Sequence, residues 1–331
     1  MTISQKLITV YGATGNQGGS VARSLLKNPD FHVRALTRSP NSAASQELVA
    51  LGAEIAKADG FSYLSMVAAF RGPWSAFVNI NSSDASFEQR GLGEFDLGKL
   101  IVDAAAEAGV QHLVFSTGPN CIALTGSEVL LKAMDMKYKI EQYIRSIGRF
   151  QAANFICAAW FLENFLPKEL APVFGGFPYV ENPEGYLTFR SPNWGGDETV
   201  PFVGIECDFG DIVQGIFLQP ERAGGKVVHG CSAIRSFDDV VADFQKATGR
   251  KARFEPVLPS WRAFETYDSP ELEEVKGMFG LTQTSGGRYF GPEVSESETA
   301  GELKTITAAA LGGGHPAQLV SVEQFFRQHV G

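Results

Sequence analysis

The sequence has few cysteines, no long apolar run and no basic cluster, and each absence excludes a class of protein. The four cysteines are far apart and form no CxxC pair, so neither a disulfide framework nor a CxxC metal or redox motif is indicated. No apolar run approaches the roughly 20 residues that a membrane-spanning helix needs. The first apolar run, 7–10, is too short for a secretory signal. We therefore expect reduced thiols, no membrane association and a cytoplasmic location, with the nucleus as the alternative.

Patterns for binding nucleic acid or metal are also absent. The net charge is −9 and no cluster of five or more Lys or Arg exists, so the field of the protein repels nucleic acid. The five histidines show neither helical i,i+4 pairing nor a cysteine partner at zinc spacing, and we predict no metal site. There is no GxSxG motif of an α/β-hydrolase. The expected partner is a small-molecule substrate or a regulated protein, and the expected state is a monomer or a homodimer.

Glycine is abundant, at 36 of 331 residues, about 11% where an average near 7% is usual. Over the first 160 residues, short β-type runs alternate with segments of helical period, which predicts a parallel sheet with crossover helices. After about residue 165, proline and glycine multiply between aromatic residues, which is typical of loops and short strands. The expected strands are 7–10, 32–36, 54–57, 76–80, 112–116, 153–158 and 226–229, and the expected helices include 97–109, 135–147, 208–219, 270–279 and two that begin near 237 and 321.

The predicted fold class is α/β, with a Rossmann-type doubly wound parallel sheet and a smaller mixed α/β C-terminal domain. We place the sheet domain at 1–160 and the smaller, loop-rich substrate or partner domain at 161–331, with some of its elements returning to the sheet. Residues of the second part should cover the carboxyl ends of the strands, where ligands bind in open α/β sheets.

A glycine-rich turn follows the first expected strand. Gly12, Gly15 and Gly18 have GxxGxxG spacing between that strand and an apolar-patterned helix. The first glycine permits a tight turn, the second lets backbone amides approach a pyrophosphate, and the third lets the helix pack closely on the strand. The sequence therefore predicts a dinucleotide site, which we extend to Thr14, Asn16 and Gln17.

The end of the second expected strand favours NADP(H) over NAD(H). About 20 residues after Gly18, where NAD sites commonly have an acid, stands Arg38. A guanidinium forms two charge-assisted hydrogen bonds to a 2′-phosphate, and Thr37 and Ser39 could add hydroxyls; a solvated strand-end cation is the alternative. Asp59, after the third strand, is either a contact near the adenine or a turn former. We predict NADP(H) as the cofactor, with Arg38, Ser39 and Asp59 among its ligands.

Five segments together resemble the NmrA-like family of atypical short-chain dehydrogenases/reductases. They are GATGNQGGSVARSLL at 12–26, LTRSP at 36–40, FSTGPN at 115–120, MDMKYKIEQYI at 134–144 and WFLENF at 160–165. The likeness continues more loosely through 200–213 and 225–244, so that it covers most of the chain. It is nearest to redox-sensor members that bind NADP(H). The glycine turn is shared with many reductases, whereas MDxKxxIExYI and FLEN are more selective. The resemblance implies a nucleotide-binding domain, a small C-terminal domain and a cleft between them.

Only part of the catalytic set of conventional short-chain dehydrogenases is present. In those enzymes a Ser, a Tyr and a Lys four residues after the Tyr work as one unit for proton transfer. Ser116 and Lys137 match the first and third members, but Ala133 stands in the place of the tyrosine. On a helix, Tyr138 points about 100° away from Lys137, and Tyr143 lies nearly two turns beyond it. We predict Lys137 and Ser116 as catalytic: the lysine as proton donor or as anchor of the nicotinamide ribose, and the serine as a polar contact near the nicotinamide or as a turn cap.

The segment after the sixth expected strand is expected to line the cleft. From the resemblance, we predict cofactor contacts for Phe161 and Asn164, with a core role for Phe161 as the alternative, and we favour a core role for Trp160. Glu163 and Asn164 are polar residues in an apolar run and need partners if they are buried. The family's usual Arg-Pro pair is replaced here by Cys-Ala-Ala at 157–159, so nothing is inferred from that arginine.

Two functions fit this sequence. The first is an NADPH-dependent oxidoreductase that reduces a carbonyl, an imine or an activated double bond of an apolar small molecule, as the resemblance implies for fungal specialised metabolism. The second is a catalytically weak or inactive NADP(H) redox sensor that regulates a protein partner. Ala133 in the place of the tyrosine suits the sensor, whereas the lysine and the aromatic-rich second half suit the enzyme.

Overall fold

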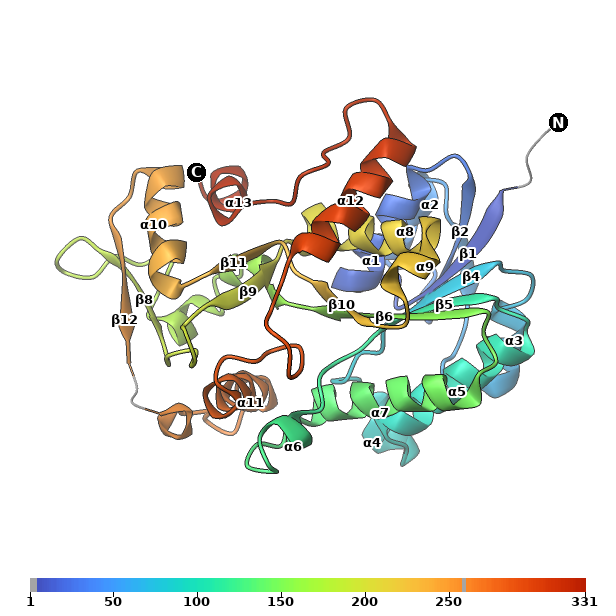
Figure 1. The fold of residues 1–331 in the computed structure, drawn as a ribbon, viewed down its shortest axis with the longest axis horizontal. Helices are drawn as coiled ribbons and strands as arrows, with labels where there is room; N and C mark the ends of the chain where they lie inside the picture. Colours follow the sequence, from blue (N-terminus) through green and yellow to red (C-terminus); the bar gives the residue numbers. More distant parts are fainter. Residues whose placement is uncertain (1–4, 258–259) are drawn as a thin grey trace.

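A seven-stranded parallel sheet is the centre of the structure, a computed structural model that describes residues 5–257 and 260–331 (Figure 1). Its strands are β1 (Lys6–Tyr11), β2 (Phe31–Thr37), β3 (Glu54–Lys57), β4 (Ser75–Val78), β5 (His112–Ser116), β6 (Ala152–Ala158) and β10 (Val227–Gly230). The order β10-β6-β5-β4-β1-β2-β3 changes direction at β1, and every neighbouring pair is parallel. This arrangement confirms the predicted α/β, Rossmann-type doubly wound sheet.

Helices cover both faces of this sheet (Figure 1). One face carries α1 (Asn16–Leu26), α2 (Ala43–Ala50), α8 (Gly210–Leu218) and α12 (Glu298–Leu311); the other carries α3 (Tyr63–Ala69), α5 (Glu94–Glu107) and α7 (Lys132–Ile147). The helices predicted at 97–109 and 135–147 are confirmed by α5 and α7. Their apolar faces bury Ile101, Ile140 and Ile144 against the sheet. In the described residues, no helix combines the length and the apolar content that crossing a membrane requires.

Segments after residue 160 complete this sheet and its helical layer. The strand β10 pairs with β6, α8 packs on α1, and α12 packs on α8. The backbones approach closely: a Cβ at Gly210 would lie 2.2 Å from the Ser20 carbonyl oxygen, and one at Gly215 would lie 2.3 Å from that of Leu303. The chain therefore leaves the sheet unit after β6 and comes back to it twice.

The remaining elements form a second lobe with an aromatic core. It has a sheet of β7 (Trp160–Phe161), β9 (Val200–Val203) and β11 (Ala233–Arg235), and a parallel pair of β8 (Leu187–Ser191) and β12 (Ala252–Pro256). Its main helices are α10 (Phe237–Thr248), α11 (Pro270–Ser285) and α13 (Val322–His329); shorter helices elsewhere in the chain are α4 (Ser86–Arg90), α6 (Cys121–Leu124) and α9 (Pro220–Ala223). Trp160 is buried and stacks on Trp194 and Phe202, which agrees with the core role favoured for it.

Candidate cofactor and substrate site

The glycine turn lies between β1 and α1, beside the point where the strand order changes direction. Gly12 has a φ of +79°, and a Cβ there would lie 2.7 Å from the carbonyl oxygen of Asn79. A Cβ at Gly18 would lie 2.2 Å from the Gly12 carbonyl oxygen. Gly15 precedes α1 and has no side chain that could cap the helix. The backbone amides of the first turn of α1 can therefore donate hydrogen bonds to a bound anion. The turn therefore has the shape that a pyrophosphate requires.

A cavity of about 530 Å³ opens beside this turn. Its wall comes from the loops that follow the parallel strands at their carboxyl ends, where ligands bind in this fold. The cavity brings together five of the predicted cofactor residues, Gly12, Thr14, Gly15, Arg38 and Ser39, with Tyr11, Ser42, Asn79, Asn81 and Asp84 among the others.

Arg38 is already paired at the edge of this cavity. Its Nη2 lies 2.9 Å from Asp84 Oδ2, and its Nη1 donates to Asp84 Oδ1 at 3.2 Å and to Ser86 Oγ at 3.0 Å. Burial alone would raise the pKa of Asp84, but hydrogen bonds from Ser86 and Arg38 outweigh it and the pKa is lowered. Asp84 fixes the guanidinium and places a negative charge beside it. Sequence reasoning missed Asp84 because it lies in a loop and belongs to no motif.

Asp59 lies outside the lining of the 530 Å³ cavity. Its carboxylate accepts hydrogen bonds from the Phe61 amide at 3.1 Å and from Arg90 at 3.0 Å. These contacts suit the turn-forming alternative, and the adenine contact stays a prediction.

Lys137 is held by three acceptors at the carboxyl end of β4. Its Nζ donates to the Ile80 carbonyl oxygen at 2.9 Å, to Ser82 Oγ at 2.6 Å and to Glu94 Oε1 at 2.5 Å. Ser82 Oγ in turn donates to Glu94 Oε1 at 3.0 Å, and the Glu94 side chain is buried. The ammonium thus occupies a defined position. No sequence signal indicated Glu94, because it begins α5 far from Lys137 along the chain.

Ser116 connects β5 to the start of α1. Its Oγ donates to Gln17 Oε1 at 2.6 Å. The next residue, Thr117, donates through Oγ1 to the buried Glu141 of α7 at 2.8 Å. Two predicted residues, one from the glycine-turn helix and one from the end of β5, are therefore in direct contact.

A second cavity, of about 300 Å³, adjoins these residues. Its wall is mainly apolar, and it gathers the predicted Gln17, Ser116, Lys137, Phe161 and Asn164. The sequence did not indicate that α11 forms part of the wall of this cavity. The lining is completed by Thr117, Leu131, Met134, 157–160, Glu274, Val275, Met278 and Tyr289.

Comparison with known proteins places the chain in a family. Residues 4–308 match the NmrA-like family. The chain belongs to the NmrA-like family. It is 61% identical over 328 residues to the NmrA-like family domain-containing oxidoreductase FrzB of a Cladobotryum species, with 98% of both chains covered. The recognised resemblance is thereby confirmed.

Solved structures share the fold of this NmrA-like protein. NmrA, a negative transcriptional regulator, in complex with NADP has a TM-score of 0.76 at 23% identity, covering 98% of this chain and 95% of that one. The same regulator has been solved with NAD, at a TM-score of 0.74, 23% identity and coverage of 93% and 95%. The triphenylmethane reductase of a Citrobacter species, complexed with NADP(H), has a TM-score of 0.67 at 15% identity, covering 98% and 100%.

Glu163 of this NmrA-like chain faces the junction of the lobes. Its Oε1 accepts a hydrogen bond from the Glu206 amide at 3.0 Å, and burial raises the pKa of its carboxyl. Glu163 is not part of the lining of the 300 Å³ cavity, whereas the next residue, Asn164, is. Of the two polar residues noted in this segment, Asn164 is thus the one that reaches the candidate site.

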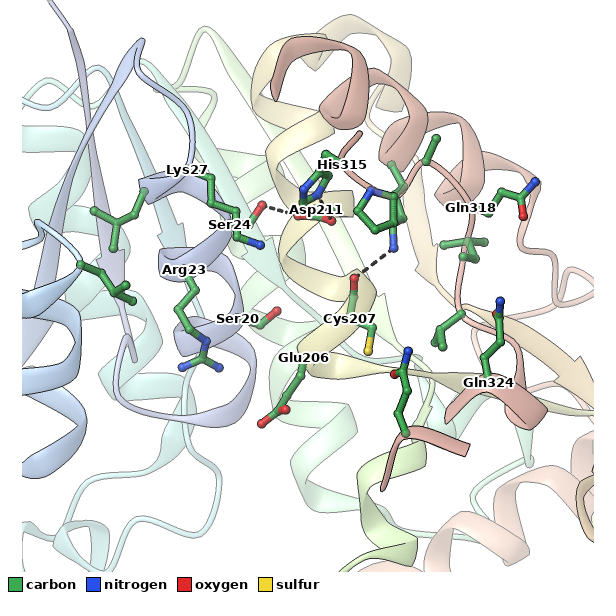
Figure 2. A pocket seen from close by; sticks show the side chains of 18 of the residues that line it. Ser20, Arg23, Ser24, Lys27, Glu206, Cys207, Asp211, His315, Gln318 and Gln324 are labelled. Atoms are coloured by element: carbon green, nitrogen blue, oxygen red, sulfur yellow. Dashed lines mark hydrogen bonds and ion pairs between the residues drawn. The ribbon is translucent and has the colours of Figure 1, made fainter. Parts of the chain in front are cut away.

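A third cavity, of about 1040 Å³, lies on the face of the sheet that carries α1 and α8 (Figure 2). Several polar groups of its lining bind one another: Ser24 Oγ donates to Asp211 Oδ1 at 2.6 Å, and His315 Nε2 lies 2.8 Å from Asp211 Oδ2. Lys304 Nζ donates to the Cys207 carbonyl oxygen at 3.0 Å. These contacts join α1 to α8, and α12 to the turn just before α8. None of the predicted site residues lines this cavity.

Proposed function

We propose that this protein is an NADPH-dependent oxidoreductase that reduces a carbonyl, an imine or an activated double bond of an apolar small molecule. The observation that carries the proposal is the 300 Å³ cavity, which combines an apolar wall with Ser116 and Lys137 and adjoins the glycine-turn helix through Gln17. Relatives 61% identical over nearly the whole chain, such as FrzB, carry the name oxidoreductase.

The residues present fit NADP(H). The turn at Gly12 and Gly18, which has no room for a Cβ, would hold the pyrophosphate. Arg38 and Ser39 would hold the 2′-phosphate, and Lys137 would hold the nicotinamide ribose. When bound, NADPH supplies the hydride for the reduction.

The chain itself provides orientation and a dry site. Lys137 is fixed by Ile80, Ser82 and Glu94, so its ammonium is preorganised and spends little entropy on ordering when a ligand binds. Apolar side chains of the wall exclude water from the reacting atoms, which strengthens the polar contacts of Ser116 and Asn164. A substrate with an apolar body and one reducible polar group would match this lining.

The test is a screen of NADPH consumption with ketones, imines, quinones and cationic dyes as acceptors. We expect turnover of at least one class, and a loss of about 100-fold in kcat/KM for Lys137→Ala. Lys139→Ala is the matched control, because Lys139 is exposed on the same helix outside the cavity and should leave the rate unchanged. Absence of turnover with every acceptor, combined with tight NADP(H) binding and a cofactor-dependent change in molecular size, would instead support the redox sensor.

A further inference from the structure

The α11 wall of the 300 Å³ cavity carries one carboxyl group, Glu274. This helix lies beside α6, next to the start of α7 (Figure 1). The approach is close, because a Cβ at Gly277 would lie 2.7 Å from Leu131 Cδ1 and one at Gly280 would lie 3.1 Å from Val129 Cγ2. This packing brings Glu274 to the same cavity as Lys137.

On α7, Glu274 lies near Ala133. The backbone of Ala133 is close enough to the Glu274 carboxyl to lower its pKa. Ala133 is the position where conventional short-chain dehydrogenases have their tyrosine, one helical turn before Lys137. An acid from the second lobe thus lies where the sequence lacks a phenol.

Desolvation is the main factor that favours the protonated form of Glu274. The surrounding protein desolvates the carboxyl, which raises its pKa, and the negative charge of Glu94 on α5 raises the pKa further. Lys137 and Lys132 of α7 and the Ala133 backbone act in the opposite direction, but the net shift is upward. The side chain also remains accessible to solvent, so it can exchange protons with water.

We propose that Glu274 is the proton donor of the reduction, in the place of the missing tyrosine. The proposal rests on the proposed reductase function. Reduction of a carbonyl forms one C–H bond from the hydride, and the π pair of the broken C=O bond takes a proton from the Glu274 carboxyl to form an O–H bond. The resulting carboxylate regains its proton from water. Lys137 then supplies a fixed positive charge beside the cavity, with its three N–H donors bound to Ile80, Ser82 and Glu94.

The decisive experiment compares two kinds of acceptor in Glu274→Gln. A ketone or imine needs a hydride and a proton, whereas a triphenylmethane dye cation needs only the hydride to become neutral. We expect kcat with the neutral acceptor to fall by about 100-fold or more and kcat with the dye to stay unchanged. Glu273→Gln is the matched control, because it removes the same charge from the same helix at a residue that does not line the cavity.

Two further readouts separate proton donation from a structural role. With the neutral acceptor, the wild-type rate should fall as the pH rises through the pKa of Glu274, which lies above the ordinary value for glutamate, and this dependence should vanish in Glu274→Gln. In the protein without cofactor, infrared difference spectra between wild type and Glu274→Gln should show the carbonyl stretch of a protonated carboxyl that titrates at the same pH.

Equal rates of wild type and Glu274→Gln with the neutral acceptor would overturn the assignment and leave the reductase function standing. A wild type that reduces no acceptor would overturn both. If the melting temperature of Glu274→Gln falls, Glu274→Asp is the deciding variant. A rate of Glu274→Asp that still falls at high pH supports Glu274 as the proton donor. A rate that does not change with pH contradicts this role.

Discussion

At the scale of residues, the edge of the nucleotide cavity is controlled by an ion pair. Arg38 offers a guanidinium to a 2′-phosphate, but two nitrogens of this guanidinium already contact the Asp84 carboxylate. The Asp84 side chain is only 13% exposed against 54% for Arg38, so the acid is the more enclosed member of the pair. Asp84 would therefore oppose the preference for NADP(H) that we predict from Arg38.

Substitutions of this pair should change nucleotide preference in opposite directions. Arg38→Ala removes charge-assisted hydrogen bonds to the 2′-phosphate and should weaken NADPH binding by about 1.5–3 kcal/mol, leaving NADH binding nearly unchanged. Asp84→Asn removes the competing negative charge and should increase the ratio of NADPH to NADH affinity. Fluorescence titration with both nucleotides measures the two ratios.

The control for this pair is Arg90→Ala, which removes another exposed cation that binds Asp59 instead of Asp84. It should leave the NADPH to NADH ratio unchanged. Equal weakening of both nucleotides by Arg38→Ala would contradict a 2′-phosphate contact.

At the scale of elements, the helical layer that covers α1 depends on glycines in α8. Gly215 meets the backbone of α12, where a Cβ would lie 2.3 Å from the Leu303 carbonyl oxygen. Backbone cannot move aside as a flexible side chain can, so the two helices would have to separate. Gly301 of α12 differs, since its added Cβ would meet only the Leu319 side chain at 3.6 Å.

These two glycines should respond differently to the same substitution. Gly215→Ala should lower stability by about 1–3 kcal/mol through overpacking. Gly301→Ala should raise it by about 0.5–1 kcal/mol, because alanine loses less backbone entropy than glycine within a helix. Melting temperatures followed by circular dichroism compare the variants. A wild-type melting temperature for Gly215→Ala would show that the helices are not in the described contact.

At the scale of the whole molecule, the sheet unit is built from distant parts of the chain. Its last strand, β10, and its covering helices α8 and α12 all follow residue 160. Without them, the edge of β6 and the outer face of α1 lose their partners. The candidate site is also built from distant parts of the chain, because α11 closes the cavity near Lys137.

A fragment of residues 1–160 should consequently fail to fold as an independent unit. We expect strong binding of a hydrophobic dye and no cooperative thermal transition, because apolar surface that α8 covers would be exposed. The full chain is the control. A sharp transition of the fragment would show that the boundary at 160 separates autonomous domains.

Sequence reasoning located most elements of the sheet unit to within a few residues but missed α12. The strands and α7 carry strong apolar periods, and α7 ends at Gly148. The buried face of α12 instead includes Lys304 and Thr307. Lys304 is buried because Asp208 and the Cys207 carbonyl oxygen receive its ammonium. A helix whose buried face mixes polar with apolar residues gives a weaker apolar period.

The sequence by itself determined the glycine turn, the alternation of strands and helices, and the arginine at the end of β2. These features are local, because backbone freedom and hydrophobic period act over a few neighbouring residues. Only the tertiary structure decided which acids face the cations of the site. Asp84 meets Arg38 across 46 residues, and Glu94 meets Lys137 across 43. Glu274 reaches Ala133 from the other lobe. Such pairs are set by how strand ends and helices pack, and no spacing along the chain encodes them.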